Sequence, residues 1–283
     1  MRTVYCSVCG SVQQRHFLSE GEYTVVTCVE CGHLYTSPLR DAATTNALYQ
    51  SSDNWIKLSS FDMPSVIKNR LEQYAGELEH VLESGAQILE VGCSKGHFLK
   101  LMQKRGFKVW GIEPSRDSEM ALQLVGQGRI QRSFYDVSFP GDLDAIVMFE
   151  VLEHIPEPHK IVKRVFNNLR QGGYFMGSVP NGEFIRFKTL PRRNIGLQKL
   201  IVPLIMDAGN HINYFSASGI QRMLELNGFE FIWARNAPLE FNYVANSFSP
   251  IAKRIWWIVA ETMRLLTGRL IGSNLWFLAR RGV

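Results

Sequence analysis

The segment AQILEVGCSKGHFLKLM, residues 86–102, constrains the fold more strongly than any other part of the chain. Its residues 88–91 form a short apolar run typical of a buried strand, and glycines bound the turn that follows. Phe98, Leu99 and Met102 then recur at helical spacing. A strand, a tight turn and a helix make up half of a βαβ unit, which builds a parallel sheet. The sequence therefore predicts an α/β fold.

The composition agrees with one large core and an appendage. The 283 residues are 46% hydrophobic and 20% charged, and 31 basic against 26 acidic residues give a net charge of +5. This charge suits a phosphate-bearing partner or an anionic membrane surface but selects neither. Because no apolar leader and no spanning segment is visible, we expect a cytoplasmic protein. In that reducing setting, cysteines are expected to be metal ligands or free thiols.

Four cysteines form a pattern typical of a small metal-binding module. Two Cys-x-x-Cys pairs are separated by eighteen residues: Cys6, Cys9, Cys28 and Cys31. This spacing matches a four-thiolate structural Zn²⁺ site, the alternative being four unlinked thiols in a core. Gly10 and Gly32 follow the pairs, where the turn favours a residue that tolerates positive φ. Because a four-sulfur site leaves no coordination position open, we expect it to fold the N-terminal segment and to have no role in catalysis.

Two acids follow buried strands and indicate a ligand at the sheet edge. The turn 92–96 lacks both G-x-G-x-x-G and G-K-[ST], which disfavours a dinucleotide or a nucleoside triphosphate. Glu90 precedes this turn, and Glu113 ends the next apolar run. In a parallel sheet both carboxylates emerge at the same edge, where α/β folds bind ligands. Glu113 could accept both ribose hydroxyls of a nucleoside, and Glu90 could hold a cationic part of the same ligand.

These motifs resemble those of class I S-adenosylmethionine-dependent methyltransferases, with LEVGCSKGHF as the cofactor turn and GIEPS as the ribose motif. The resemblance continues through FPGDLDAIVMFEVLEHI and LRQGGYFMGSVPN and covers about residues 70–236. It implies a Rossmann-like seven-stranded sheet with helices on both faces. It also implies S-adenosylmethionine as the cofactor, bound by Glu90, Gly92, Cys93, Ser94, Gly96, Glu113, Pro114 and Phe149. Ser94 stands where the family has a glycine, which narrows the turn.

An acid and histidine cluster follows the strand predicted before residue 150. Glu150, Glu153 and His154 have the spacing of one helical face, and His211 follows the fifth strand. The arrangement resembles the Glu-x-x-Glu-His set with a distant His of small-RNA 3′-terminal 2′-O-methyltransferases, and the Glu-x-x-Glu-His of ubiquinone-pathway O-methyltransferases. That resemblance implies a divalent ion such as Mg²⁺ or Mn²⁺ that grips a vicinal diol or catechol. In the metal-free alternative, Glu150 caps the helix, Glu153 is solvated, and one histidine alone acts as a general base.

The family resemblance also suggests how the chain divides. We expect a zinc ribbon over residues 1–40, a helical linker and cofactor lid over 41–84, and a methyltransferase domain over 85–283 with inserts at about 182–210 and 237–273. The first insert is rich in basic side chains: Arg186, Lys188, Arg192, Arg193 and Lys199. It is interpreted as an acceptor lid that holds a diphosphate or an RNA backbone, or as a solvated loop. The second contains an amphipathic helix, which favours core or dimer packing over contact with a membrane surface at 250–270.

The expected function is O-methylation of a small hydroxylated acceptor. A sugar or nucleotide-sugar is favoured because zinc-ribbon methyltransferases of sugar pathways look similar at the N-terminus, which would place the enzyme in polysaccharide biosynthesis. Some of those enzymes methylate carbon, for which His154, His211 or Tyr214 could serve as the base. RNA methylation, and a catalytically silent zinc-binding interaction protein, are the remaining alternatives.

Overall fold

The computed structural model describes residues 5–20, 22–38, 65–126, 129–133, 142–194, 210–238 and 250–282. Among these residues, no helix combines the length and the hydropathy that crossing a membrane would require. The region expected to cover the cofactor before residue 65 lies outside the described residues, as do residues 195–209 of the first insert.

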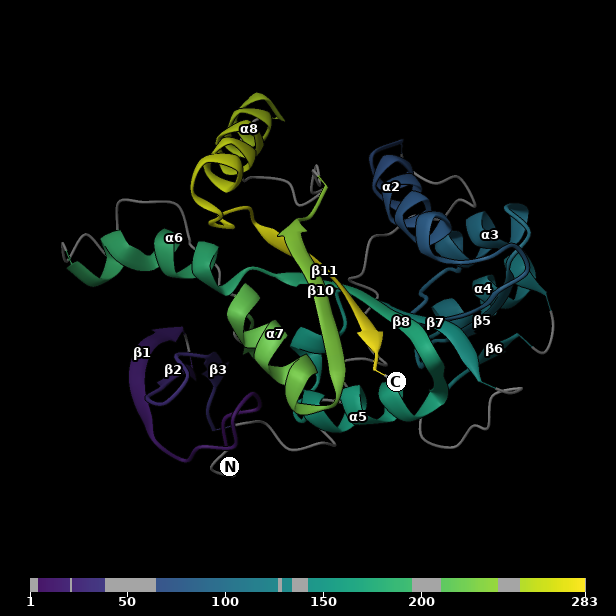
Figure 1. Ribbon diagram of the computed structural model, residues 1–283. Coiled ribbons are helices and arrows are strands. Elements are labelled where there is room, and N and C mark those ends of the chain that lie inside the picture. The colour runs from purple at the N-terminus through teal and green to yellow at the C-terminus, as the bar shows by residue number, and fades with distance from the viewer. Residues whose placement is uncertain are drawn as a thin grey trace.

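A seven-stranded sheet forms the centre of the described structure, in the order β10-β11-β8-β7-β4-β5-β6 (Figure 1). The strands are β4 (Gln87–Val91), β5 (Lys108–Ile112), β6 (Ile130–Gln131), β7 (Leu143–Phe149), β8 (Leu169–Pro180), β10 (Phe229–Asn236) and β11 (Asn274–Arg281). Each neighbouring pair in the series β6-β5-β4-β7-β8 is parallel. Strand β11 pairs antiparallel with both β8 and β10. The predicted Rossmann-like methyltransferase sheet is therefore confirmed.

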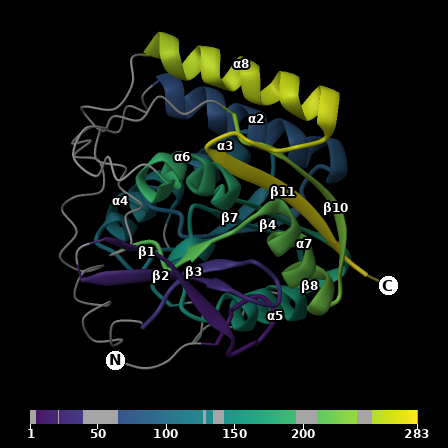
Figure 2. The same ribbon diagram turned by 90° about the vertical axis from the view of Figure 1, so that its left-hand side faces the viewer.

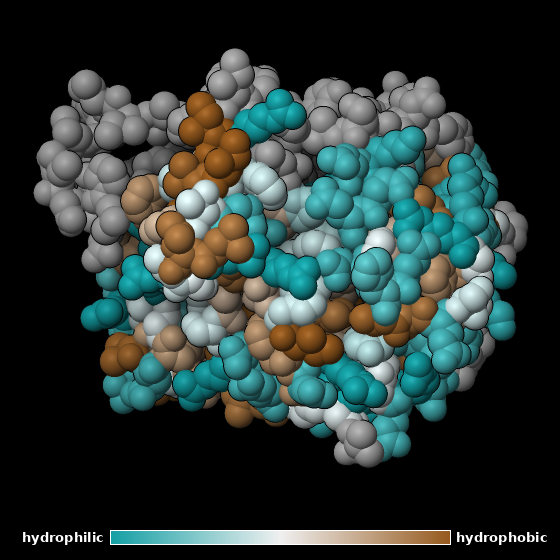
Figure 3. Space-filling view, turned by 45° about the horizontal axis from the view of Figure 1, so that its top comes forward, coloured by the Kyte–Doolittle hydropathy of each residue, from teal (hydrophilic) through white to brown (hydrophobic). Residues whose placement is uncertain are grey.

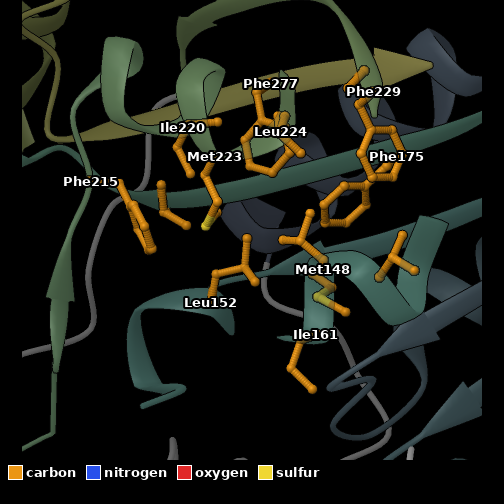
Figure 4. Packing of buried hydrophobic residues seen from close by; sticks show 14 of the residues in the cluster. Met148, Leu152, Ile161, Phe175, Phe215, Ile220, Met223, Leu224, Phe229 and Phe277 are labelled. Carbon is orange, nitrogen blue, oxygen red and sulfur yellow. The ribbon is translucent and has the colours of Figure 1, made fainter. Parts of the chain in front are cut away.

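Helices cover both faces of this sheet, also as predicted. One face carries α2 (Ser65–Val81), α3 (His97–Lys104) and α4 (Asp117–Val125), and the other carries α5 (Pro158–Asn168) and α7 (Ala217–Leu226). Successive residues of β7 alternate between the two cores, because a strand points its side chains to opposite faces. Ala145 and Val147 join the core under α2 and α3. Ile146 and Met148 join the core under α5 and α7. Figure 4 shows Met148 in this core, near Leu152 and Ile161.

The N-terminal residues form a small antiparallel sheet that shares a strand with the rest of the chain. Its own strands are β1 (Gln14–Glu20), β2 (Tyr23–Cys28) and β3 (Leu34–Thr36), and β9 (Asn213–Tyr214) completes it in the order β1-β2-β3-β9. Figure 2 faces this ribbon and shows it against the body of the molecule. The ribbon is therefore joined by backbone hydrogen bonds to a segment about 180 residues later in the sequence.

Three further elements leave the central layers. The 3₁₀ helix η1 (Leu152–His154) follows β7, α6 (Gly182–Asn194) follows β8, and α8 (Pro250–Thr267) lies between β10 and β11. Trp256 of α8 stacks on Phe187 of α6, with ring centroids 5.7 Å apart. The inserts expected at 182–210 and 237–273 thus each contain a helix, and the two helices touch.

Candidate active site and zinc site

The four cysteines of the ribbon converge on one point. Their sulfur atoms all lie within 4.8 Å of one another, and two pairs, Cys6–Cys31 and Cys9–Cys28, have an Sγ–Sγ distance of 3.5 Å. Zn–S bonds of about 2.3 Å in a tetrahedral site place sulfurs just under 4 Å apart, so the cluster fits one zinc ion. This convergence matches the predicted zinc ribbon.

The knuckle turns explain why glycine follows each cysteine pair. Gly10 N donates to Cys6 O at 2.8 Å, and Gly32 N donates to Cys28 O at 3.0 Å. Both glycines have left-handed φ, +75° and +73°, which confirms the expectation for these positions. The hydrogen bond with Cys6 lowers the pKa of Cys31 to about 5 and prepares its sulfur as a thiolate, the form that binds metal.

The turn after β4 approaches the start of η1 closely. Gly92 has φ +78°, and a Cβ built there would lie 2.5 Å from Val151 Cγ2. Gly96, with φ +79°, is the N-cap residue that precedes α3. A side chain at Gly92 would therefore both strain the turn and push away the segment that carries Glu153 and His154. The predicted cofactor turn and the acid–histidine segment are neighbours in space.

Glu113 connects this turn to the loop after β5. Its Oε2 accepts from Ser94 N at 2.8 Å, and its Oε1 accepts from Ser115 N at 2.9 Å. Ser94 adopts φ +44° and donates its hydroxyl to Asp117 Oδ2 at 2.8 Å, so serine is accommodated where the family has glycine. A carboxylate oxygen has more than one lone pair, which leaves Glu113 able to accept ribose hydroxyls as well.

Glu90 is the polar group in this region whose environment most strongly indicates a ligand. It is 5% exposed, and its Oε2 has no hydrogen-bond partner in the described structure. Burial, reinforced by the charge of Glu113, raises the pKa of Glu90 well above its usual value. A cationic group placed beside these two carboxylates would stabilise their charged forms. The sulfonium and ammonium of S-adenosylmethionine have the charge that this site lacks.

The other predicted cofactor residues occupy varied positions. Cys93 is buried against Gly111, and a Cβ added at Gly111 would lie 2.7 Å from the Sγ of Cys93. Burial raises the pKa of the Cys93 thiol far above the usual range. It fills the turn. Pro114 is exposed beside Glu113. Phe149, at the end of β7, stacks on Tyr74 of α2 with a centroid distance of 4.4 Å.

Glu153, His154 and His211 form a second cluster of possible metal ligands, with ligand atoms all within 4.8 Å. Glu153 and His154 are buried. His154 Nδ1 donates to Asn210 O at 3.0 Å, which leaves Nε2 as the acceptor, 3.8 Å from Glu153 Oε1. Burial and the neighbouring His154 lower the pKa of His211 to about 3. His211 can therefore bind a metal ion through a neutral imidazole nitrogen, and His154 presents its Nε2 toward Glu153.

Glu150 is not brought into this cluster. Its Oε1 accepts from Ser178 Oγ at 2.7 Å, and its Oε2 accepts from Asn274 Nδ2 at 2.9 Å. The predicted common helical face does not form, because Glu150 has a left-handed φ of +56° and only the short 3₁₀ turn follows. Both carboxylates thus stand at the end of β7 but have different neighbours.

Tyr214 lies at the margin of the acid–histidine cluster, with its ring edge-on to that of His211 and the two ring centroids 6.4 Å apart. It is buried in a packing cluster with Phe17, Val25, Leu34 and Ile185, between the ribbon and α6. The neighbouring Asn213, which sequence patterns did not single out, contacts both the ribbon and the segment after η1. No periodic pattern marks Asn213, although it lies between the candidate catalytic residues His211 and Tyr214.

A mixed seven-stranded sheet of this order, with a glycine-bounded turn and two carboxylates at its edge, is typical of S-adenosylmethionine-dependent methyltransferases. The family model described as Methyltransferase domain matches residues 62–233, more than half of the chain. The protein belongs to this family.

Curated relatives include proteins named Ubiquinone biosynthesis O-methyltransferase. The Leptothrix cholodnii protein is 23% identical over 204 residues, which cover 69% of this chain and 79% of that relative. The Chromobacterium violaceum protein is 28% identical over 110 residues, which cover 36% of this chain and 47% of that relative. The chain thus spans about four fifths of the first relative and about half of the second.

Solved structures share the fold at low sequence identity. Magnesium protoporphyrin IX methyltransferase from Synechocystis PCC 6803, solved with bound SAH, has a TM-score of 0.54 and 13% identity, covering 86% of this chain and all 100% of that one. A chain of the complex between the Haloferax volcanii Trm112 methyltransferase activator and a methyltransferase has a TM-score of 0.51 and 12% identity, covering 77% and 89%. These likenesses support the fold.

Proposed function

We propose that the enzyme methylates an oxygen of a small acceptor that carries two adjacent hydroxyl groups. The cluster of Glu153, His154 and His211 carries this proposal, because it combines one carboxylate and two imidazoles beside the proposed cofactor turn. Such a set suits a divalent ion. The curated relatives are named O-methyltransferases, which supports oxygen as the accepting atom.

The residues of the chain would divide the work between two neighbouring positions. When bound, S-adenosylmethionine supplies an activated methyl group, and a divalent ion at the cluster would hold both acceptor oxygens and lower the pKa of the attacked one. Glu113 and Glu90 orient the nucleoside and its cationic tail. Glu153, His154 and His211 hold the acceptor side, with His154 fixed by the carbonyl of Asn210. The reaction then requires the oxygen in line with the methyl carbon.

The proton of the acceptor hydroxyl could also be removed without a metal ion. A neutral His154 or His211 could take the acceptor's proton as a general base. Both versions use the same residues, so dependence on a divalent ion distinguishes them.

A sugar or nucleotide-sugar acceptor is part of the same proposal but has less support. Of the basic residues expected to hold a diphosphate, Arg186 has a described side chain, and it hydrogen-bonds Gly32 O and lies over the Phe17 ring, 5.5 Å from its centroid. Arg186 therefore faces the ribbon. A small polyhydroxylated or ortho-dihydroxy aromatic acceptor asks for no diphosphate site.

Methyl-labelled S-adenosylmethionine tests this function with ortho-dihydroxy aromatic compounds, nucleotide-sugars and RNA as separate acceptors. After chelation and return of Mn²⁺ or Mg²⁺, we expect labelled methyl on a diol oxygen. Glu153→Gln should lower the rate by about 10- to 100-fold. The control is Glu157→Gln, at an exposed residue paired with Lys160, which should leave the rate unchanged. Labelling of RNA or of carbon would contradict the proposal, and full activity after chelation would exclude its metal version.

We also propose that α8 rests on an anionic lipid surface. Its outward face is apolar: Ile255, Ile258, Val259, Leu265 and Leu266 are 42–77% exposed, and hydrophobic side chains gather where α8 lies (Figure 3). The exposed residues Arg254 and Arg269 lie near the two ends of this face. Glu261 turns inward to Asn236 and Arg264. An apolar face with cations and no exposed carboxylate among its described residues complements anionic lipid better than a second copy of itself.

Vesicle flotation tests the α8 proposal. We expect binding to vesicles rich in phosphatidylglycerol and none to phosphatidylcholine alone. Ile258→Glu should abolish flotation, whereas Ile232→Glu, at an exposed isoleucine of β10, should leave it intact. Absence of flotation, or a dimer that Ile258→Glu dissociates, would overturn the proposal.

A further inference from the structure

The segment that carries His211 is held between the ribbon and η1. On one side, β3 pairs antiparallel with β9, and Thr36 N donates to Ile212 O at 2.8 Å. Thr36 Oγ1 also donates to the carbonyl of His211 itself, at 3.1 Å. On the other side, Ile212 N donates to Glu153 O at 2.8 Å. The backbone of His211 and Ile212 therefore connects the ribbon to Glu153, which belongs to the same cluster as His211.

One buried amide joins both zinc knuckles to the same place. Asn213 is 1% exposed, and its Nδ2 donates to Ile155 O at 2.7 Å, directly after His154. Its Oδ1 accepts from Ser7 Oγ at 2.6 Å and lies 3.2 Å from His33 Nε2. Ser7 stands between Cys6 and Cys9, and His33 follows Cys31. Because a carboxamide oxygen only accepts, His33 Nε2 carries the proton in this contact.

The cofactor side of the site is built differently. Glu113 accepts from Ser94 and Ser115, and the turn residues Gly92 and Cys93 donate to Ile112 O. These bonds all lie between β4, β5 and their following turns. The ribbon thus contacts the acceptor edge directly, whereas the cofactor turn is held by local bonds.

We propose that the zinc knuckles are a positioning element of the acceptor site, acting through Asn213. Zinc bound to the four cysteines would fix Ser7 and His33, these would fix Asn213, and Asn213 with β9 would hold His211 opposite Glu153 and His154. The inference rests on the proposed function for its kinetic consequence. It assigns Asn213 as a positioning residue and gives the ribbon a role beyond folding its own segment.

Two variants test this without touching the cysteines. Ser7→Ala removes one donor to Asn213, and Asn213→Ala removes every side-chain bond of the link while the backbone pairing of β3 with β9 remains. Ser11→Ala is the matched control, because Ser11 is a half-buried serine of the same ribbon whose hydroxyl accepts from Gln13 N and is not bonded to Asn213. For each protein we would measure zinc content, S-adenosylmethionine affinity by calorimetry, kcat and acceptor KM, and hydrogen exchange of residues 211–214.

In the two test variants, zinc content and S-adenosylmethionine affinity should remain within about twofold of wild type. Exchange at residues 211–214 should accelerate, and kcat/KM for the acceptor should fall about tenfold or more, because small displacements of reacting groups are costly. Ser11→Ala should behave as wild type. Unchanged exchange at 211–214, or a parallel loss of S-adenosylmethionine affinity, would overturn the proposal.

Zinc removal from the wild-type protein gives a readout that does not depend on the acceptor. A thiol-compatible chelator should accelerate exchange at residues 211–214 and leave S-adenosylmethionine binding in place. If the chain methylates no diol, the proposed function fails while this coupling still stands. If zinc removal leaves exchange at 211–214 unchanged, the coupling fails whatever the acceptor.

Discussion

At the scale of single residues, the site contains groups that serve a ligand better than they serve the unliganded fold. Glu90 is the main example, since its carboxylate is buried with Oε2 unpaired and with Glu113 nearby. Folding raises its pKa above the unfolded value of 4.5, so its contribution to stability is present below that pH and is lost as the pH rises. Between pH 4.5 and its raised folded pKa, Glu90 of the unliganded protein must hold a proton that the unfolded chain would release, and this lowers the stability of the fold.

Glu90→Gln removes this titratable group and should have opposite effects on stability and on ligand binding. In unfolding experiments without ligand, we expect the variant to be about 1 to 3 kcal/mol more stable than wild type near pH 8, with a smaller difference near pH 5. Calorimetry should show S-adenosylmethionine affinity lowered about tenfold or more. The control Glu119→Gln alters an exposed carboxylate and should change neither quantity. Equal stability together with equal affinity would refute this role of Glu90.

A side chain at Gly92 should destabilise the turn after β4. Gly92→Ala forces a side chain onto φ +78° and against Val151, so it should cost about 1 to 3 kcal/mol of stability and weaken S-adenosylmethionine binding. In the double variant, adding Val151→Ala should recover only the stability lost through the clash with Val151, because the strain at φ +78° remains. Gly76→Ala is the comparison, because its Cβ would meet nothing within 4 Å inside α2, and it should stabilise slightly. A neutral Gly92→Ala would contradict the close approach of turn and η1.

At the scale of elements, local patterns were predictable and long-range pairings were not. The strand, turn and helix at 86–102 follow from periodicity and glycines that lie within one short segment. The pairing of β3 with β9 involves two residues on one side and nearly 180 positions of separation, and such a short strand leaves no periodic signal. The same limit applies to Glu150, because one left-handed residue directs its side chain to Ser178 and away from Glu153.

This difference between the two carboxylates after β7 can be measured. Glu150→Gln places an amide NH₂ against a hydrogen-bond donor, Ser178 or Asn274, and should cost about 1 to 3 kcal/mol of stability. Its Mn²⁺ affinity should match wild type. Glu153→Gln should instead lower Mn²⁺ affinity by about 10- to 100-fold. Calorimetric titration of each variant with Mn²⁺ measures this difference. An equal loss of Mn²⁺ affinity in Glu150→Gln would show that Glu150 is also a metal ligand.

At the scale of the whole molecule, the chain joins two units of different construction around one sheet edge. The sheet and its helices form the proposed cofactor side, and because β4 and β5 are parallel neighbours, their ends bring Glu90, Gly92 and Glu113 to one edge as the sequence predicts. The proposed acceptor side is assembled from η1, β9 and the ribbon, whose contacts depend on the tertiary fold. Acceptor chemistry is accordingly the part that sequence patterns left most open.

The central claim is that S-adenosylmethionine occupies the edge formed by Glu90, Gly92 and Glu113, with its sulfur toward Glu153, His154 and His211. A crystal structure of the zinc-loaded protein with S-adenosylhomocysteine tests it directly. We predict ribose hydroxyls on the Glu113 carboxylate and the sulfur facing the two histidines. A nucleoside bound elsewhere, or a sulfur that points away from those histidines, would contradict this account.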